Sequence, residues 1–321
     1  MAQPILVAEN VVKHYGLKAA GFSRRKGLVR AVQDVSFSVA AGEVFGLVGE
    51  SGCGKSTLGR VLLRLEEPTA GRVFFNGEDV SGFDRPRLRQ FRREAQIVYQ
   101  DPYSSLNPRR RIGELIGEPL DIHGVGSYQE RQDRVAWLLA VVGLLPEHAR
   151  RYPHEFSGGQ RQRIVIARAL ALNPRLLLAD EPVSALDVSI QAQVINLLQK
   201  LQAEFQLTYL FISHDLSLVE YVADRVAVMY LGRLVELAPK RELYRRPLHP
   251  YTQALLSAAP LPDPNAKKNR ILLSGDVPSP INPPAGCSFH PRCHEKRGIC
   301  SEQLPELREL NPGCWVACHN R

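Results

Sequence analysis

The stretch EVFGLVGESGCGKST, residues 43–57, constrains the fold more than any other part of the chain. A short apolar run enters a glycine-rich loop, and TLGRVLLRL then places apolar residues at helical spacing. The loop fits the pattern G-x-x-x-x-G-K-[ST] at Gly49, Gly54, Lys55 and Ser56. Glycines let successive backbone N–H groups point at phosphate oxygens, and the following helix adds the positive end of its dipole. The sequence therefore predicts a strand, a phosphate-binding loop (P-loop) and a helix.

Individual residues of the predicted loop have expected roles in binding the phosphates of a nucleotide. Lys55 would reach the β- and γ-phosphates, and the Ser56 hydroxyl would ligate Mg²⁺. Cys53 is interpreted as a small filler within the loop. The residues expected to surround the phosphates are Gly49, Glu50, Ser51, Gly52, Cys53, Gly54, Lys55, Ser56 and Thr57.

Three further polar groups follow apolar, strand-like runs. LLLADEP presents Asp180 for Mg²⁺ and Glu181 to polarise the attacking water. Gln100 follows IVY and His214 follows LTYLFIS, and ligands of parallel sheets bind outside the carboxyl ends of the strands. Gln100 is therefore expected to contact Mg²⁺ and the water, and His214 to contact the γ-phosphate or orient Glu181. Taken alone, Asp180 and Glu181 could belong to an ordinary turn, a histidine such as His214 is more often structural than catalytic, and Gln100 is a weak signal.

The order of the elements indicates an α/β chain. Apolar strands alternate with amphipathic helices, which is typical of a parallel sheet covered on both faces. The first forty residues instead indicate antiparallel strands around a basic loop at 16–27, with VSFSV as a half-buried strand. Residues 101–163 are polar and then helical, and the tail is rich in proline and cysteine.

Composition limits the remaining functions. The 321 residues carry a formal charge of +8, which suits nucleic acid, anionic lipid or a phosphorylated ligand, although the basic residues are scattered. The N-terminus has neither a basic start nor an apolar core, so we expect no signal peptide. No window approaches the roughly twenty apolar residues of a spanning helix, so we expect that the chain does not cross a membrane by itself.

Taken in order, these motifs resemble the ATP-binding subunits of ABC transporters. FSGGQRQR, residues 156–163, decides this, because it is similar to the signature motif of that family. Two such subunits in the family enclose two ATP molecules head to tail. The resemblance implies that the signature serves a partner's ATP, that Tyr15 stacks on adenine, and that SALD at 184–187 is the D-loop. The signature residues concerned are Ser157, Gly158, Gly159 and Gln160.

The resemblance also implies an ATPase with a P-loop NTPase (RecA-like) fold. An ABC ATPase domain would span 1–240, with its core at 1–100 and 164–240, an antiparallel β subdomain, and a helical subdomain at 101–163. A C-terminal appendage carrying the cysteines would span 241–321.

A narrower resemblance rests on three segments. DPYSSLNPR (101–109), RRPLHPYTQALLSAAP (245–260) and SGDVPSPINPPAGCSFHPRC (274–293) look like the second ATPase subunit of the dipeptide, oligopeptide and nickel importers. The resemblance implies peptide import with a second ATPase subunit, usually in a heterodimer, two transmembrane permease subunits and an extracytoplasmic peptide-binding protein. The chain would lie at the cytoplasmic face of the bacterial inner membrane. Nickel or haem is an alternative cargo, and a soluble ABC ATPase acting on nucleic acid or ribosomes is an alternative class; we expect no nucleic-acid partner.

Five of the six cysteines follow residue 286. Disulfides are disfavoured in the expected cytosolic compartment, so a metal or free thiols are the alternatives. The spacing is wider than C-x-x-C, although His290 and His294 keep zinc open. The importer resemblance implies a [4Fe–4S] cluster, with Cys314 departing from the pattern. We expect this site to be remote from the ATP chemistry, on the ligands Cys287, Cys293, Cys300 and Cys318.

Overall fold

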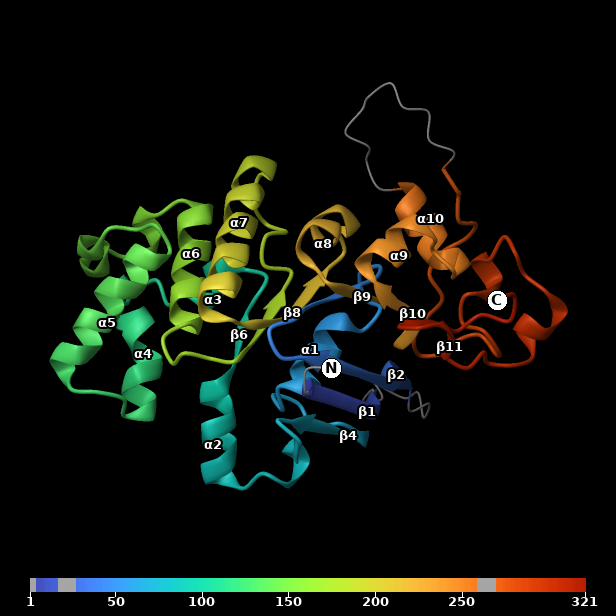
Figure 1. Ribbon diagram of the computed structural model, residues 1–321, viewed down its shortest axis with the longest axis horizontal. Coiled ribbons are helices and arrows are strands. Elements are labelled where there is room, and N and C mark those ends of the chain that lie inside the picture. Colours follow the sequence, from blue (N-terminus) through green and yellow to red (C-terminus); the bar gives the residue numbers. More distant parts are fainter. Residues whose placement is uncertain (1–3, 17–26, 259–269) are drawn as a thin grey trace, which may run out of the picture. The chain divides into compact units, whose positions relative to one another are not determined.

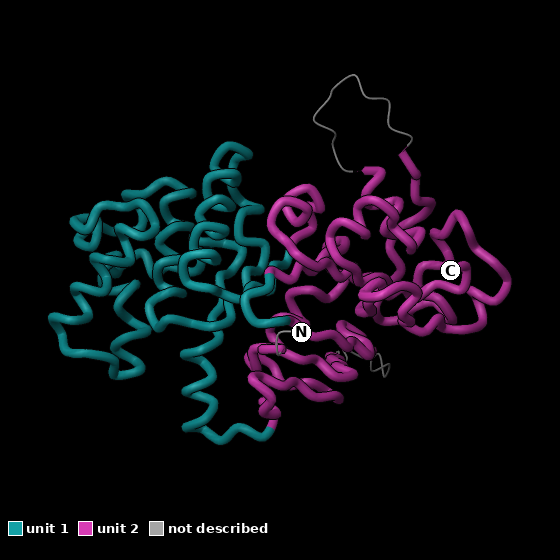
Figure 2. Tube along the Cα trace, viewed as in Figure 1, with its two compact units in different colours: residues 1–3, 40–43, 82–212 teal, residues 4–39, 44–81, 213–321 magenta. Residues whose placement is uncertain are grey.

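The computed structural model describes residues 4–16, 27–258 and 270–321. Residues 17–26, where the sequence predicts most of a basic loop, lie outside this range. The described chain forms two compact units (Figure 2): unit 1 holds residues 40–43 and 82–212, and unit 2 holds residues 4–39, 44–81 and 213–321. These bounds differ from the predicted domain boundaries at 100, 163 and 240, which stay a prediction.

Unit 2 contains the predicted antiparallel β subdomain. Its four-stranded sheet has the order β2-β1-β4-β5, and β4 pairs antiparallel with both β1 and β5. The strands are β1 (Pro4–Gly16), β2 (Leu28–Ala40), β4 (Ala70–Phe75) and β5 (Glu78–Asp79). In VSFSV, the valines and Phe37 are buried while Ser36 is exposed, as the alternation predicts.

A second group of strands in unit 2 carries the P-loop. β3 (Val44–Val48) is buried throughout and pairs in parallel with β9 (Arg225–Tyr230). Beyond β9, the antiparallel strands follow in the order β10 (Arg233–Pro239), β12 (Cys314–Val316) and β11 (Arg308–Asn311). The C-terminal region therefore contributes strands to the same sheet as the P-loop strand.

The described residues of unit 2 form four α-helices. They are α1 (Lys55–Leu62), α8 (Leu216–Val222), α9 (Lys240–Arg245) and α10 (Pro250–Ala258). The buried residues of α1 include Leu58, Val61 and Leu62, which repeat at helical spacing. The apolar face of the sequence thus holds the helix against the core.

Unit 1 contains three parallel strands and the helices around them. β6 (Ala95–Val98) pairs with β7 (Leu176–Asp180), which pairs with β8 (Thr208–Ser213). β7 and β8 are buried throughout, which explains their continuous apolar runs. The flanking helices are α2 (Arg85–Glu94), α6 (Gly158–Ala169) and α7 (Val188–Phe205).

The predicted helical subdomain lies in unit 1. α3 (Pro102–Ser105), α4 (Ile112–His123) and α5 (Tyr128–Val141) gather around α6 (Figure 1). Ser127 begins α5 with a capping box that it shares with Glu130, so local sequence fixes this helix start. The expected α/β fold with an antiparallel subdomain and a helical subdomain is confirmed. Among the described helices, none is both long enough and apolar enough to span a membrane.

Candidate nucleotide site

The P-loop of unit 2 requires glycine at its two ends. A Cβ on Gly49 would lie 2.2 Å from the Met229 carbonyl oxygen, and one on Gly54 would lie 2.1 Å from the Ala31 carbonyl oxygen. Gly54 also has a φ of 106°, which side chains rarely adopt. The loop therefore passes close to β2 and β9 at positions where only hydrogen fits.

Lys55 begins α1 with its ammonium directed into the loop. Its Nζ donates to the carbonyl oxygens of Gly49 at 2.8 Å and of Glu50 at 3.1 Å, and the residue is 4% exposed. Cys53 is also buried, and burial raises the pKa of its thiol. Cys53 thus fills space as expected, and the Lys55 ammonium is held by two carbonyl oxygens of the loop.

Glu50 is held by residues that the sequence did not single out. Its N–H donates to the Tyr251 hydroxyl at 2.9 Å, and its carboxylate pairs with Arg292 at 2.9 Å. Arg292 lies one position before Cys293, so the expectation that the cysteine region is remote from the P-loop is wrong. These partners are separated by up to 242 positions, and no local pattern reports such a contact.

Tyr15, the predicted adenine platform, lies near the end of β1. Its hydroxyl donates to the Glu66 carboxylate, and the Lys13 ammonium lies 5.0 Å from the ring centroid. Burial, followed by the bond to Glu66, raises the pKa of Tyr15. The ring is therefore fixed in orientation, with a cation near it.

In unit 1, the ends of neighbouring strands bring Gln100 and Glu181 together. Gln100 Nε2 donates to Glu181 Oε2 at 3.0 Å. Glu181 has a left-handed φ of 48°, and its N–H donates to the Ile212 carbonyl oxygen at 2.9 Å. This backbone conformation costs a residue other than glycine about 1 kcal/mol or more. The hydrogen bond to Ile212 on the neighbouring strand β8 helps to hold Glu181 in it, at the turn after β7. Asp180, the last residue of β7, is buried beside it.

The signature segment forms the start of α6 in unit 1. Ser157 Oγ accepts from the Gln160 N–H at 3.4 Å, and Gln160 Oε1 accepts from the Ser157 N–H at 3.1 Å. The first N–H groups of a helix have no partner within it, which suits an anion. A Cβ on Gly159 would lie 2.4 Å from Ile190 Cγ2, compared with 3.3 Å from Leu186 for Gly158. Packing against α7 therefore leaves no room for a side chain at position 159.

The remaining predicted residues are distributed between the units. His214 directly follows β8 and is exposed, and it belongs to unit 2 with Ser56 and Thr57. The D-loop residues 184–187 belong to unit 1, where the Ser184 hydroxyl donates to the Glu181 carbonyl oxygen at 3.1 Å. The roles of all these residues stay predictions.

The predicted iron–sulfur cluster is wrong. In the described chain, no three His, Cys, Asp or Glu side chains are arranged to hold a metal ion, so zinc has no support either. All the cysteines are free, and burial raises the pKa of Cys287 to about 11. The spacing of the cysteines along the sequence does not indicate how deeply their thiols are buried.

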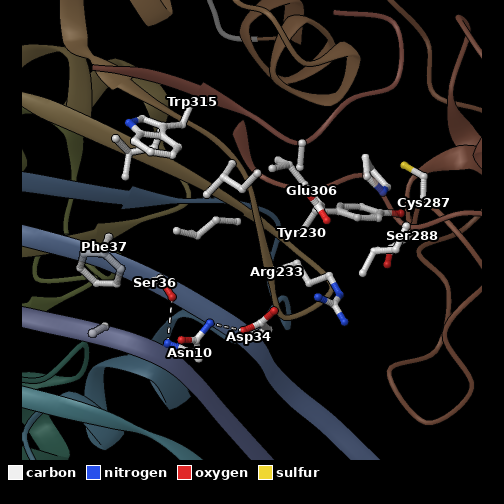
Figure 3. Close-up of a pocket in the computed structure, with 18 of the residues that line it drawn as sticks. Asn10, Asp34, Ser36, Phe37, Tyr230, Arg233, Cys287, Ser288, Glu306 and Trp315 are labelled. Atoms are coloured by element: carbon white, nitrogen blue, oxygen red, sulfur yellow. Dashed lines mark hydrogen bonds between the residues drawn. The ribbon is translucent and has the colours of Figure 1, made fainter. Parts of the chain in front are cut away.

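A pocket of about 640 Å³ also lies in unit 2, away from the P-loop residues. Figure 3 shows that Asn10, Asp34 and Ser36 form a hydrogen-bonded polar wall, whereas Tyr230 and Cys287 lie at another end. Residues 49–57 are absent from the described lining. This pocket is therefore not the predicted phosphate site.

Two family matches cover separate parts of the chain. Residues 32–184 match the family described as ABC transporter. Residues 235–300 match the family described as oligopeptide/dipeptide transporter, C-terminal region. The first match includes the P-loop and the signature. The second includes Tyr251, Arg292 and three of the C-terminal cysteines.

Individual proteins match over most of their length. The oligopeptide transport ATP-binding protein AppF of Bacillus subtilis is 56% identical over 320 residues, which cover 99% of this chain and 97% of AppF. A probable peptide ABC transporter ATP-binding protein of Sinorhizobium fredii, y4tS, is 54% identical over 100% of this chain and 91% of that protein.

Solved structures match the ATP-binding cassette. The dimeric post-hydrolysis cassette MJ0796 bound to ADP and Pi has a TM-score of 0.64 and 30% identity, over 74% of this chain and 99% of that one. The protein cbiO1 from Clostridium perfringens, part of the ABC transporter complex cbiONQ, has a TM-score of 0.65 and 26% identity, over 76% of this chain and 91% of that one.

Proposed function

The chain belongs to the ATP-binding proteins of ABC transporters, and from this premise we propose that it powers the import of dipeptides or oligopeptides. As a member it is an ATPase that uses ATP and Mg²⁺. The observation that supports a peptide cargo is the match of residues 235–300 to the oligopeptide/dipeptide transporter C-terminal region. The near full-length identity to AppF, whose name includes oligopeptide transport, supports the same cargo.

The P-loop is proposed to bind the phosphates of ATP. Its glycines bring backbone N–H groups close to a ligand, and Lys55 already holds a buried ammonium against the loop carbonyls. Tyr15 is proposed to stack on the adenine. Ser56, Gln100 and Asp180 are proposed as ligands of Mg²⁺, because hydroxyl, amide and carboxylate oxygens are those that Mg²⁺ prefers. Mg²⁺ would neutralise charge on the β- and γ-phosphates.

Glu181 is proposed to polarise the attacking water. The Gln100 amide donates to one carboxylate oxygen and orients the carboxylate, and a carboxylate can accept a proton from water. His214 is proposed to contact the γ-phosphate or orient Glu181. The support for both roles is their place at strand ends, as in other parallel α/β sheets.

The signature residues 157–160 are proposed to bind the γ-phosphate of a partner subunit's ATP. Their support is the start of α6, where the N–H groups of the first turn and the helix dipole favour an anion. We propose a head-to-tail dimer with a second, different ATPase subunit. This dimer would bind two transmembrane permease subunits, and an extracytoplasmic peptide-binding protein would deliver the substrate to them. The complex would lie in the bacterial inner membrane with this chain on its cytoplasmic face, and without a nucleic-acid partner.

The domain division is part of the same proposal. We assign 1–240 to the ATPase domain, with a helical subdomain at 101–163 that contacts the permease subunits, and 241–321 to the C-terminal region.

Uptake in a strain that lacks this gene tests the cargo. We expect the deletion strain to lose uptake of a labelled dipeptide or oligopeptide, and the intact gene, but not the Lys55→Ala variant, to restore it. Nickel and haem uptake are measured in parallel. Loss of nickel or haem uptake with unchanged peptide uptake would contradict peptide import while leaving the ATPase in place.

A further inference from the structure

We propose that Arg292, in the cysteine-containing C-terminal region, is a positioning residue for the P-loop. Its guanidinium holds Glu50, and through Glu50 it fixes the loop conformation that binds ATP. The proposal rests on the proposed function only in requiring that this loop binds ATP. It makes the C-terminal region part of the nucleotide site.

The contact between the two residues is a two-pronged ion pair. Arg292 Nη1 lies 2.9 Å from Glu50 Oε2, and Nη2 lies 3.3 Å from Oε1. The Arg292 side chain is 9% exposed and that of Glu50 is 26% exposed, so solvent screens the pair weakly. Arginine bonded through two nitrogens restricts both the distance and the orientation of a carboxylate. The pair therefore fixes the Glu50 side chain in place.

The backbone of Glu50 is held from the same region. Its N–H donates to Tyr251 Oη at 2.9 Å, and its carbonyl oxygen accepts from Lys55 Nζ at 3.1 Å. Side chain, N–H and carbonyl of one loop residue are thus all bonded. A shift of Glu50 would move a carbonyl that orients the Lys55 ammonium, which is the charge expected to meet the phosphates.

The groups that hold Glu50 are themselves rigid. Tyr230, Tyr251 and Phe289 are each at most 1% exposed, and their ring centroids lie 4.7 to 5.3 Å apart. Phe289 directly precedes the short helix η4 (His290–Arg292), and its carbonyl accepts from the Arg292 N–H at 3.0 Å. Figure 3 shows Tyr230 beside Cys287. Arg292 therefore projects from a buried aromatic cluster to the loop.

A second ion pair in the same region provides a matched control. Arg321 Nη2 lies 2.8 Å from Glu295 Oε1, with side chains 25% and 29% exposed. Neither residue bonds to the P-loop in the described structure. Loss of this pair removes a comparable interaction from the C-terminal region without touching Glu50.

The test measures the binding of a fluorescent ATP analogue to the full-length chain, together with its thermal unfolding midpoint. We expect Arg292→Ala and Glu50→Gln each to weaken binding about tenfold, because coupled residues outside a ligand's contacts typically change its affinity by factors of about 2 to 30. The double variant should bind no more weakly than the weaker single variant, since both remove the same pair. Arg292→Lys, which keeps the charge without the fork, should recover part of the affinity. Glu295→Gln should lower the midpoint and leave the affinity unchanged.

Wild-type affinity in Arg292→Ala would overturn the proposal, and so would an equal loss of affinity in Glu295→Gln, which would indicate general destabilisation. Should Arg292→Ala fail to fold, Arg292→Lys and Glu50→Gln carry the same comparison. Absence of ATP binding by the wild-type chain would overturn the proposed function as well, whereas unchanged affinity in the variants overturns only the role of Arg292.

Discussion

Acid should destabilise this protein through the buried imidazole of His249. The residue is 1% exposed, and its Nδ1 accepts a hydrogen bond from the Tyr251 N–H at 3.0 Å. Burial, and then the charge of Arg321, lower the pKa of His249 to about 3, with Glu295 acting weakly in the opposite direction. The neutral imidazole is therefore the form that fits the folded state.

The sign and size of the effect follow from proton linkage. A free histidine has a pKa of about 6.5, so below this pH the unfolded chain takes up a proton that the folded chain refuses until about pH 3. The stabilisation is present above pH 6.5 and is lost as the pH falls. Each pH unit in this window costs about 1.4 kcal/mol, so the loss by pH 5 is about 2 kcal/mol.

Urea unfolding of two proteins at two pH values measures this loss. His249→Asn offers Oδ1 as an acceptor in place of Nδ1 but takes up no proton. Between about pH 7 and about pH 5, we expect the wild type to lose about 2 kcal/mol more than the variant. The neighbouring Glu236 carboxylate, whose pKa is raised by burial, is present in both proteins and cancels in the difference. Equal losses in the two proteins would refute the reasoning about His249.

Three further predictions concern the P-loop, Glu181 and the signature glycines. Lys55→Ala should weaken binding of a fluorescent ATP analogue by at least about tenfold, because the loop loses its buried ammonium; unchanged affinity would remove Lys55 from phosphate binding. Glu181→Gln should retain ATP binding and lower steady-state ATP hydrolysis by about 100-fold or more, since an amide cannot take a proton from water; sustained turnover would assign that step to another group. Gly159→Ala should cost about 1 to 3 kcal/mol in thermal unfolding experiments, because its Cβ would lie 2.4 Å from Ile190, whereas Gly158→Ala should cost less. Equal costs at the two glycines would contradict the packing argument.

The P-loop and its flanking elements were predictable because their signals are local. The apolar run of β3, the loop glycines and the helical spacing of α1 lie within twenty positions, and each constrains the backbone directly. The same holds for the half-buried strand VSFSV and for the serine caps of α5 and α6. The pairing of Gln100 with Glu181 could be anticipated, since both were placed at strand ends of one parallel sheet.

The partners of Glu50 were not predictable, because nothing local marks them. Arg292 lies 242 positions from Glu50, in a segment whose cysteines drew attention to metal chemistry. Cysteine spacing along the chain does not determine whether the thiols converge or are buried, and burial raises the pKa of Cys287. Tyr251 likewise reads as one aromatic among others until folding brings its hydroxyl to the P-loop.

The pairing of β12 with β10 bears on how this chain can be shortened or fused. In that ladder, Glu236 lies opposite Val316 and Leu237 opposite Trp315, so the last residues of the chain cover a strand that would otherwise be a sheet edge. A chain that stops before residue 308 would leave unpaired the N–H and C=O groups of β10 that face β12, whereas the β9 side would stay paired. Bare edges of this kind recruit strands from other molecules. We therefore expect β12 and β11 to protect β10 from such pairing, and a tag used for purification is better placed at the other end.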